Sequence, residues 1–307
     1  MFPSIPTDAI EFVRSAFRTA NAAATLVLTR QPSMHEEALD QQIVTALDGV
    51  GSSIMPGSGA AVGIETHWLG GRRHFGNWEI ADIAVAVIVR RVGMLAARKV
   101  ALLQSKRLYS KELSVEEENR ADYMESISRL IEIEQSVATM TAARSFSFTE
   151  NCVYGQIAAE DEQPTRIESY VAAHDIPVYY SLYNPATLPM TSTVPQINPS
   201  TPPPNVELGC RVLRMSDVHL VLSRMRAGQR PRFSDLVRAV PAGDKDYFAA
   251  HGWRLEDFIA DEVLKCREGR LFERTQDSVL DRLLRGRTAP ISALIVITID
   301  LAQGEEG

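Results

Sequence analysis

The sequence predicts a protein of the α/β class, and three observations support this prediction. Two apolar runs, residues 78–91 and 97–109, are separated only by VGMLA, which is typical of a β-hairpin of β-branched strands. A helical segment at residues 166–175 leads directly into a strand-like run at residues 176–185. A third apolar run, residues 289–302, fits a buried strand near the C-terminus. Helices and strands therefore alternate in one chain, as in α/β proteins.

The N-terminal part of the sequence predicts helices before the hairpin and a long helix after it. Residues 8–30 have an alanine-rich middle, and residues 34–51 place apolar side chains at helical spacing before two glycines. A glycine-rich loop over residues 49–63 follows this second helix. After the hairpin, a Ser-x-x-Glu capping box opens residues 114–140, which are expected to form a long charged helix.

A proline-rich segment divides the chain into two unequal parts. Residues 189–205 contain six prolines and few apolar side chains, which is typical of a surface loop or an extended linker. We therefore expect residues 1–185 to form the main folded unit with its N-terminal helix, and residues 186–206 to form the loop. Residues 207–307 are expected to be mostly helical, with one late strand that can rejoin the first sheet.

The composition indicates a globular protein without a membrane span. An apolar fraction of 45% in 307 residues suits a packed core. The apolar runs are shorter than the roughly 20 residues that a transmembrane helix needs. The N-terminus lacks the basic region of a signal peptide, and Asp8 and Glu11 interrupt it. Cys152, Cys210 and Cys266 are scattered, as expected of reduced thiols, so we expect a cytoplasmic protein.

The net charge of the chain limits the ways in which it can bind nucleic acid. The formal net charge of −7 argues against a protein that coats nucleic acid nonspecifically, because such binding depends on Lys and Arg. It remains compatible with an enzyme that has a local basic cleft. Basic side chains cluster at residues 70–74, 89–91, 105–107 and 223–233.

Polar side chains that are suited to catalysis stand where the first hairpin strand begins and where the second one ends. Gln104 and Lys106 lie on one face of their strand, because strand side chains alternate with period two, and Asp82 stands near the start of the partner strand. Glu36 lies roughly 20° around its helix from Ile43 and so shares the core-facing stripe. A carboxylate that faces the core is costly unless it is paired or binds a metal. We therefore expect these four polar side chains to converge.

This set of side chains fits metal-assisted hydrolysis of a phosphodiester. Carboxylate and amide oxygens are hard ligands suited to Mg²⁺, or alternatively to Mn²⁺. On this hypothesis Glu36, Asp82 and Gln104 bind the metal. Lys106 then positions the attacking water and stabilises the charge that develops on the phosphate.

The order of these residues resembles that of the PD-(D/E)XK nuclease superfamily, in the Gln-x-Lys branch shared with Mrr-like restriction endonucleases and other prokaryotic defence nucleases. The resemblance rests on Glu36 in EEALD, Asp82 in EIAD, and Gln104 and Lys106 in LLQSKRL. It implies a restriction-endonuclease-like αβββαβ core with a mixed sheet, in which the first helix supplies the glutamate and the second and third strands supply the rest. The proline that names the motif is absent before Asp82.

The resemblance also implies a function, which is metal-dependent cleavage of DNA in defence against foreign DNA. Such enzymes often pair to cut both strands, so a homodimer is expected, and a partner defence protein is a further possible partner. Cleavage of RNA stays open, because these side chains contact the phosphate and not a 2′-hydroxyl. The alternative is a catalytically degenerate scaffold or sensor subunit that binds nucleic acid or a protein partner.

Other charged residues near the hairpin are secondary candidates. Glu79 and Glu65 are possible additional acidic ligands, although each also fits an exposed surface position. Arg72 and Arg73 lie in the basic cluster before the hairpin, where they can contact nucleic acid. Arg107 points to the opposite face of its strand from the proposed site, as a structural residue or a phosphate contact.

Overall fold

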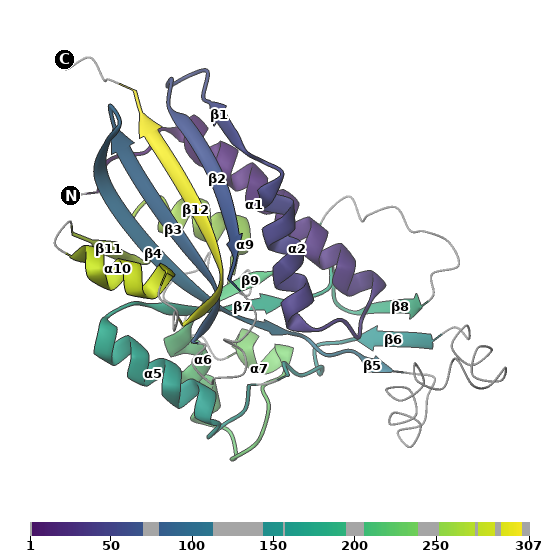
Figure 1. Cartoon of the computed structure of the whole chain (residues 1–307). Coiled ribbons are helices and arrows are strands. Elements are labelled where there is room, and N and C mark those ends of the chain that lie inside the picture. Colours follow the sequence, from purple (N-terminus) through teal and green to yellow (C-terminus); the bar gives the residue numbers. More distant parts are fainter. Residues whose placement is uncertain are drawn as a thin grey trace, which may run out of the picture.

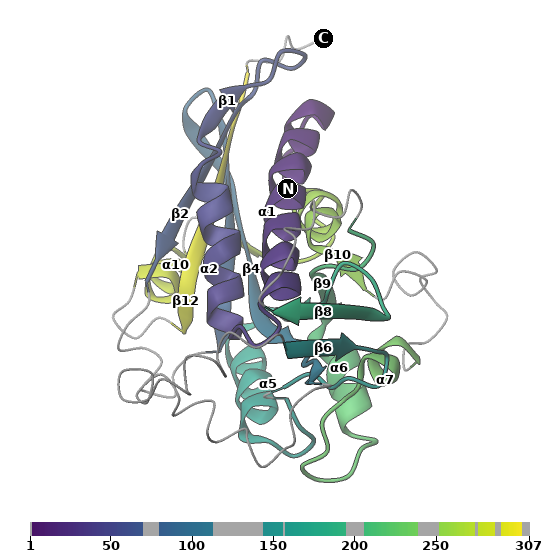
Figure 2. The same cartoon turned by 90° about the vertical axis from the view of Figure 1, so that its right-hand side faces the viewer.

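The computed structural model of the chain describes residues 2–69, 80–112, 144–155, 157–194, 206–238, 252–273, 276–285 and 290–302. These residues form a mixed α/β structure around a twisted main sheet, with a small second sheet beside the lower end of the helices α1 and α2 (Figures 1 and 2).

The main sheet has the strand order β1-β2-β12-β3-β4-β7-β9-β10, and β11 pairs with β4. Its strands are β1 (Ser52–Ile54), β2 (Ala61–Trp68), β3 (Ala81–Arg91), β4 (Met94–Arg107), β7 (Val178–Tyr183), β9 (Arg211–Arg214), β10 (Trp253–Arg254), β11 (Arg270–Phe272) and β12 (Ile291–Leu301). The small sheet has the order β5-β6-β8, with β5 (Lys111–Glu112), β6 (Arg144–Phe148) and β8 (Met190–Val194).

The helices are α1 (Thr7–Arg30), α2 (Glu36–Asp48), α5 (Glu162–His174), α6 (Met215–Leu222), α7 (Phe233–Arg238), α9 (Leu255–Asp257), a π-helix over Phe258–Val263, and α10 (Asp277–Arg285). The two N-terminal helices pack against each other, and α2 contacts β2, β3 and β4 (Figure 1). Among the described helices, none combines the length and the apolar composition that a membrane span requires.

The two strands β3 and β4 form the predicted hairpin. They are antiparallel, with Ile83 opposite Leu103, and the chain reverses at Val92 and Gly93, both of which have positive φ. Most side chains of β3 are buried on both faces. That burial explains why the strand is an almost continuous run of Ala, Val and Ile rather than an apolar-polar alternation.

A helix leads the chain back to the main sheet after the hairpin, so that the next strand of this sheet runs parallel to β4. Helix α5 leads into β7, as the sequence predicts, and β7 runs parallel to β4 with Ser181 beside Ser105. Strand β9 then pairs with β7 in the antiparallel direction. The main sheet is therefore mixed, because β4 and β7 are parallel while β3 and β4 are antiparallel.

The late apolar run forms β12, which lies between β2 and β3. It is antiparallel to β2 and parallel to β3, so both of its edges are hydrogen-bonded. Ile295, Ile297 and Ile299 are at most 1% exposed. A strand from the C-terminal end of the sequence thus joins the N-terminal strands in a single core.

We expect Ile297→Ala to lower the free energy of unfolding by about 2–5 kcal/mol, because the removed side chain leaves a cavity in the centre of the sheet. The matched control is Ile54→Ala, since Ile54 is also an isoleucine in a strand but is 73% exposed. Its expected change is within about 0.5 kcal/mol. Urea unfolding of both variants measures the difference, and equal losses would contradict a central position for β12.

A polar contact inside the core fixes α1 to the C-terminal part of the chain. Asn21 is 2% exposed. Its Oδ1 accepts a hydrogen bond from the backbone N–H of Cys210 at 2.8 Å, and its Nδ2 donates one to Glu256 Oε2 at 2.8 Å. Both ends of the amide are therefore satisfied, which makes this buried polar group compatible with a stable core.

The C-terminal part differs from the sequence-based expectation. The sequence predicts a mostly helical region after residue 206 with one late strand, and β12 is that strand. Strands β9, β10 and β11 also join the main sheet, which the sequence does not predict. Strands β9, β10 and β11 have four residues or fewer, which is too short for hydrophobic periodicity to reveal. Residues 190–194 of the proline-rich segment form β8, and the predicted helix at residues 114–140 lies outside the described residues.

Candidate active site

The candidate site lies where β3 begins, β4 ends and α2 begins. Asp82 stands opposite Gln104, because the register that pairs Ile83 with Leu103 continues by one residue. Gln104 Nε2 donates a hydrogen bond to Asp82 Oδ2 at 2.5 Å, and the backbone N–H of Ser105 donates one to the same oxygen at 2.6 Å. One carboxylate oxygen of Asp82 is thereby held against the end of β4.

Glu36 approaches the same strand end from the first turn of α2. Its Oε1 accepts a hydrogen bond from the backbone N–H of Arg107 at 3.1 Å, and its Oε2 lies 3.8 Å from Lys106 Nζ. The Lys106 side chain is 2% exposed, so Glu36 supplies the compensating charge that a buried ammonium needs. The structure thus brings the four predicted side chains together as two pairs along the end of β4.

The charges of Glu36 and Lys106 affect each other. Burial raises the pKa of Glu36 above its ordinary value, and the nearby ammonium of Lys106 opposes that shift. The ammonium therefore favours the ionised form of Glu36, which is the form that can accept a cation or pair with a lysine. Removing Lys106 would make Glu36 easier to protonate.

Asp40 is a part of this site that the sequence analysis does not identify. It lies on α2, is 2% exposed, and its Oδ1 accepts hydrogen bonds from Ser105 Oγ at 2.5 Å and from Tyr183 OH at 2.6 Å. Burial, and secondarily the negative charge of Asp82, raise the pKa of Asp40 well above its ordinary value. A carboxyl group that holds its proton more strongly than an ordinary aspartate therefore lies directly behind the candidate site.

A signal for Asp40 is present in the sequence. Residues four apart lie on the same face of a helix, so Asp40 shares the inward face of α2 with Glu36. The same helical geometry that selects Glu36 also selects Asp40. Ser105 has no comparable signal, because it acts on Asp82 through its backbone.

One oxygen atom of the site is suited to binding a hard cation. Gln104 Oε1 is buried, and no described residue donates a hydrogen bond to it. An unpartnered buried carbonyl oxygen beside the carboxylate of Asp82 is the kind of ligand that Mg²⁺ accepts. Among the residues that the structure describes, no three His, Cys, Asp or Glu side chains form a group that could hold a metal. A metal here would therefore depend on the Gln104 amide and on water.

Glu65 lies away from the candidate site. It is on β2, level with Val296 of β12, which is itself level with Ala86 of β3. Two strand spacings and four residues along the strand, roughly 10 and 13 Å, therefore separate Glu65 from the position of Asp82. Its side chain is 71% exposed, with His67 Nε2 3.9 Å from its Oε2. The structure does not place Glu65 in the site.

The predicted nucleic-acid contacts are only partly described. Arg107 is 4% exposed, its Nη1 donates a hydrogen bond to the Pro32 carbonyl at 2.6 Å, and its guanidinium stacks on the Tyr109 ring at 3.7 Å. Its guanidinium is thus used inside the fold, which favours the structural role of Arg107 over a phosphate contact. Glu79, Arg72 and Arg73 lie outside the described residues.

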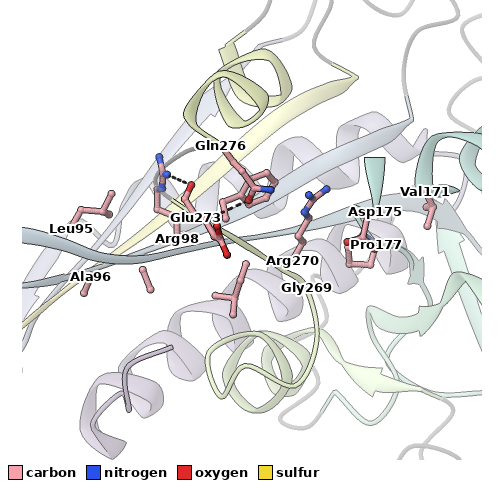
Figure 3. A pocket seen from close by; sticks show the side chains of 13 residues that line it. Leu95, Ala96, Arg98, Val171, Asp175, Pro177, Gly269, Arg270, Glu273 and Gln276 are labelled. Carbon is pink, nitrogen blue, oxygen red and sulfur yellow. Dashed lines mark hydrogen bonds between the residues drawn. The ribbon is translucent and has the colours of Figure 1, made fainter. Parts of the chain in front are cut away.

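A cavity of about 830 Å³ lies at the other end of β4 (Figure 3). It is lined by the start of β4 up to Arg98, by β11 and by the end of α5. Figure 3 shows the Arg98 and Arg270 side chains in different parts of this cavity, and Arg98 Nη2 donates a hydrogen bond to the Glu273 carbonyl. Six residues of strand, roughly 20 Å, separate Arg98 from Gln104, so this cavity is distinct from the candidate site.

Comparisons with known proteins identify no relative of this chain. No family model matches the chain, and no significant match is found among curated proteins or among solved structures.

Proposed function

We propose that the protein is a metal-dependent nuclease that hydrolyses phosphodiester bonds of DNA, with the restriction-endonuclease-like fold of the PD-(D/E)XK superfamily. The observation that supports this proposal is the meeting of Asp82, Gln104, Lys106 and Glu36 around the end of β4, with Gln104 Oε1 buried and without a hydrogen-bond donor among the described residues. Carboxylate, amide and ammonium groups from three elements are the parts that such chemistry requires.

The order of elements supports the proposal as well. Helix α2 carries Glu36, and β2, β3 and β4 follow it, with Asp82 on the second strand and Gln104 and Lys106 on the third. Helix α5 then leads into β7, which is parallel to β4. With the short strands β1, β5 and β6 left aside, this order is compatible with the αβββαβ core that the resemblance implies. The insertion of β12 between β2 and β3 is a departure from that minimal core.

The roles of the residues follow from their chemistry. Asp82, Gln104 and Glu36 would hold Mg²⁺ or Mn²⁺, which when bound supplies an activated water and neutralises phosphate charge. The ammonium of Lys106 would orient that water and stabilise the negative charge of the transition state. The buried body of β4 holds Gln104 and Lys106 in fixed positions, as a preorganised site needs.

Incubation of the protein with plasmid, linear duplex DNA, single-stranded DNA and RNA, with and without Mg²⁺, tests the proposal. We expect cleavage of DNA that requires the metal and is lost in Asp82→Asn. This variant can still accept the hydrogen bonds from Gln104 and Ser105, because an amide oxygen replaces the carboxylate oxygen. Cleavage of RNA alone would favour the ribonuclease alternative, and no cleavage under any condition would refute the proposal.

The alternative proposal is a scaffold or sensor subunit with a degenerate site. The burial of the site favours it, since Gln104 and Lys106 are at most 3% exposed. Titration calorimetry with Mg²⁺ and Mn²⁺ separates the two proposals. A nuclease should bind the metal saturably and lose this binding in Asp82→Asn, whereas a scaffold should show no such binding.

The remaining parts of the proposal depend on the resemblance to the nuclease superfamily. They are a role in defence against foreign DNA, a homodimer that cuts both strands, and a partner defence protein that delivers the nuclease. A cytoplasmic location is proposed from the three scattered cysteines. Sedimentation of the protein with and without duplex DNA tests the homodimer, and a monomer under both conditions would exclude it.

A further inference from the structure

The connection between α6 and α7 carries a concentrated positive charge. Its four arginines, which we call the arginine loop, are Arg224, Arg226, Arg230 and Arg232. All four are exposed, and none of their guanidinium groups makes a hydrogen bond or ion pair with another described residue. In a chain with a net charge of −7, four such guanidinium groups within one short loop indicate a surface for an anionic partner.

The arginine loop is held in place by the backbone rather than by its side chains. The N–H of Gly228 donates a hydrogen bond to the Ala159 carbonyl at 2.9 Å, and the N–H of Ala159 donates one to the Gln229 carbonyl at 3.0 Å. Further along, the N–H of Tyr154 donates to the Pro231 carbonyl at 2.9 Å. The loop is therefore fixed against Tyr154 and Ala159 before any partner binds, which lowers the entropic cost of binding.

The segment that holds the arginine loop also borders the candidate site. The N–H of Tyr109 donates a hydrogen bond to the Val153 carbonyl at 2.9 Å, and Leu108 forms a bridge with Tyr154. Gly155 approaches so closely that a Cβ there would lie 2.0 Å from the Tyr109 ring, so no side chain fits. The segment is thus packed directly against the residues that follow Lys106.

These contacts set the distance between the arginine loop and the site. Leu108 and Tyr109 lie beside residues 153–154, which lie beside Pro231 and Arg232. Two such spacings, roughly 10 Å, therefore separate the backbone of Arg232 from the chain just after β4. In Figures 1 and 2 the connection between α6 and α7 lies at the same end of the molecule as the start of α2, which carries Glu36. Phosphates a few nucleotides apart on one strand, rather than adjacent ones, would therefore contact the two surfaces.

We propose that the arginine loop binds the phosphate backbone of the DNA that the candidate site would cleave, an inference that rests on the proposed nuclease function. The guanidinium group presents a fork of N–H donors that matches two phosphate oxygens, so it is suited to this contact. Among the described residues, no carboxylate forms an ion pair with these four guanidinium groups. Asp161 accepts a hydrogen bond from the backbone N–H of Glu162, and Asp235 accepts one from that of Arg232.

The test is DNA binding by fluorescence anisotropy in the presence of EDTA, with a labelled duplex and the full chain. The loop variant replaces all four arginines of the arginine loop with glutamine. We expect its dissociation constant to rise by roughly tenfold or more, and the slope of log K against log salt to become less steep by up to about 3.6, at about 0.9 per lost phosphate contact.

The matched control changes net charge by the same amount elsewhere. It replaces four other exposed arginines with glutamine, namely Arg18, Arg90, Arg91 and Arg282. This control should bind DNA with the wild-type constant and salt slope, and both variants should unfold at the wild-type temperature, because exposed substitutions change stability little. Equal weakening in the two variants would overturn the inference, because net charge would then explain the effect, and so would preferential binding of RNA.

The outcomes separate this inference from the proposed function. If the protein binds DNA through the arginine loop but never cleaves it, the inference stands and the nuclease function fails. If the protein cleaves DNA while the loop variant binds and cleaves like the wild type, the nuclease function stands and the inference fails.

Discussion

Replacing Lys106 with methionine is expected to lower metal-dependent cleavage of DNA by roughly 10²- to 10³-fold, which is the usual loss when one transition-state donor is removed. Methionine keeps most of the apolar stem and removes the ammonium, so the change acts mainly on charge. The loss has a second cause, because burial raises the pKa of Glu36 and the ammonium of Lys106 is the largest influence that opposes this shift. Initial rates on plasmid DNA measure the effect.

Lys99→Met is the matched control for this prediction. Lys99 is on the same strand and is 1% exposed, but its Nζ donates a hydrogen bond to the Val263 carbonyl at 3.0 Å, far from Asp82. We expect this variant to lose stability and to keep the wild-type cleavage rate per folded molecule. If Lys106→Met cleaves as fast as Lys99→Met, then Lys106 has no part in catalysis.

The parts of the site that local geometry determines could be predicted from the sequence. The period of two in a strand places Gln104 and Lys106 together, and the angle around a helix places Glu36 inward. These rules need only neighbouring residues, and the structure brings the three side chains to the same strand end. Asp40 obeys the same helical rule, but its role in holding Ser105 is visible only in the structure, because the two residues are far apart in the sequence.

The parts that depend on distant pairing could not be predicted. Residues 289–302 read as a buried strand, and they form one, but nothing in them indicates which strands they join. Strand β12 pairs with residues more than 200 positions earlier, and such pairings arise from the packing of the whole sheet. The burial of Arg107 is a similar case, because its partner Pro32 lies in the connection between α1 and α2.

Asp40→Ala is expected to lower the free energy of unfolding by roughly 2–5 kcal/mol, because it leaves the hydroxyl groups of Ser105 and Tyr183 buried without their acceptor. Asp40→Asn should lose much less, since its amide oxygen can still accept both hydrogen bonds. Urea unfolding in EDTA at neutral pH measures both values. Equal losses in the two variants would show that the hydrogen bonds at Asp40 contribute little.

The pH dependence of these variants tests the charge state of Asp40. Its pKa is raised well above the ordinary 3.8, first by burial and then by the charge of Asp82, so the folded protein keeps this proton to a higher pH than the unfolded chain does. The stability that the protonated group contributes is therefore complete below the unfolded pKa and is lost as pH rises through the folded pKa. Asp40→Asn cannot lose a proton.

The difference in unfolding free energy between Asp40→Asn and the wild type should therefore move in favour of the variant as pH rises from 4 towards 8. Burial also raises the pKa of Glu36. Because Glu36 is present in both proteins, its contribution to the unfolding free energy largely cancels in this difference. Unfolding in urea with EDTA, at a series of pH values, gives the curve. A difference that stays constant with pH would mean that Asp40 ionises in the folded protein as it does in the unfolded chain, and that no neutral carboxyl group lies behind Ser105.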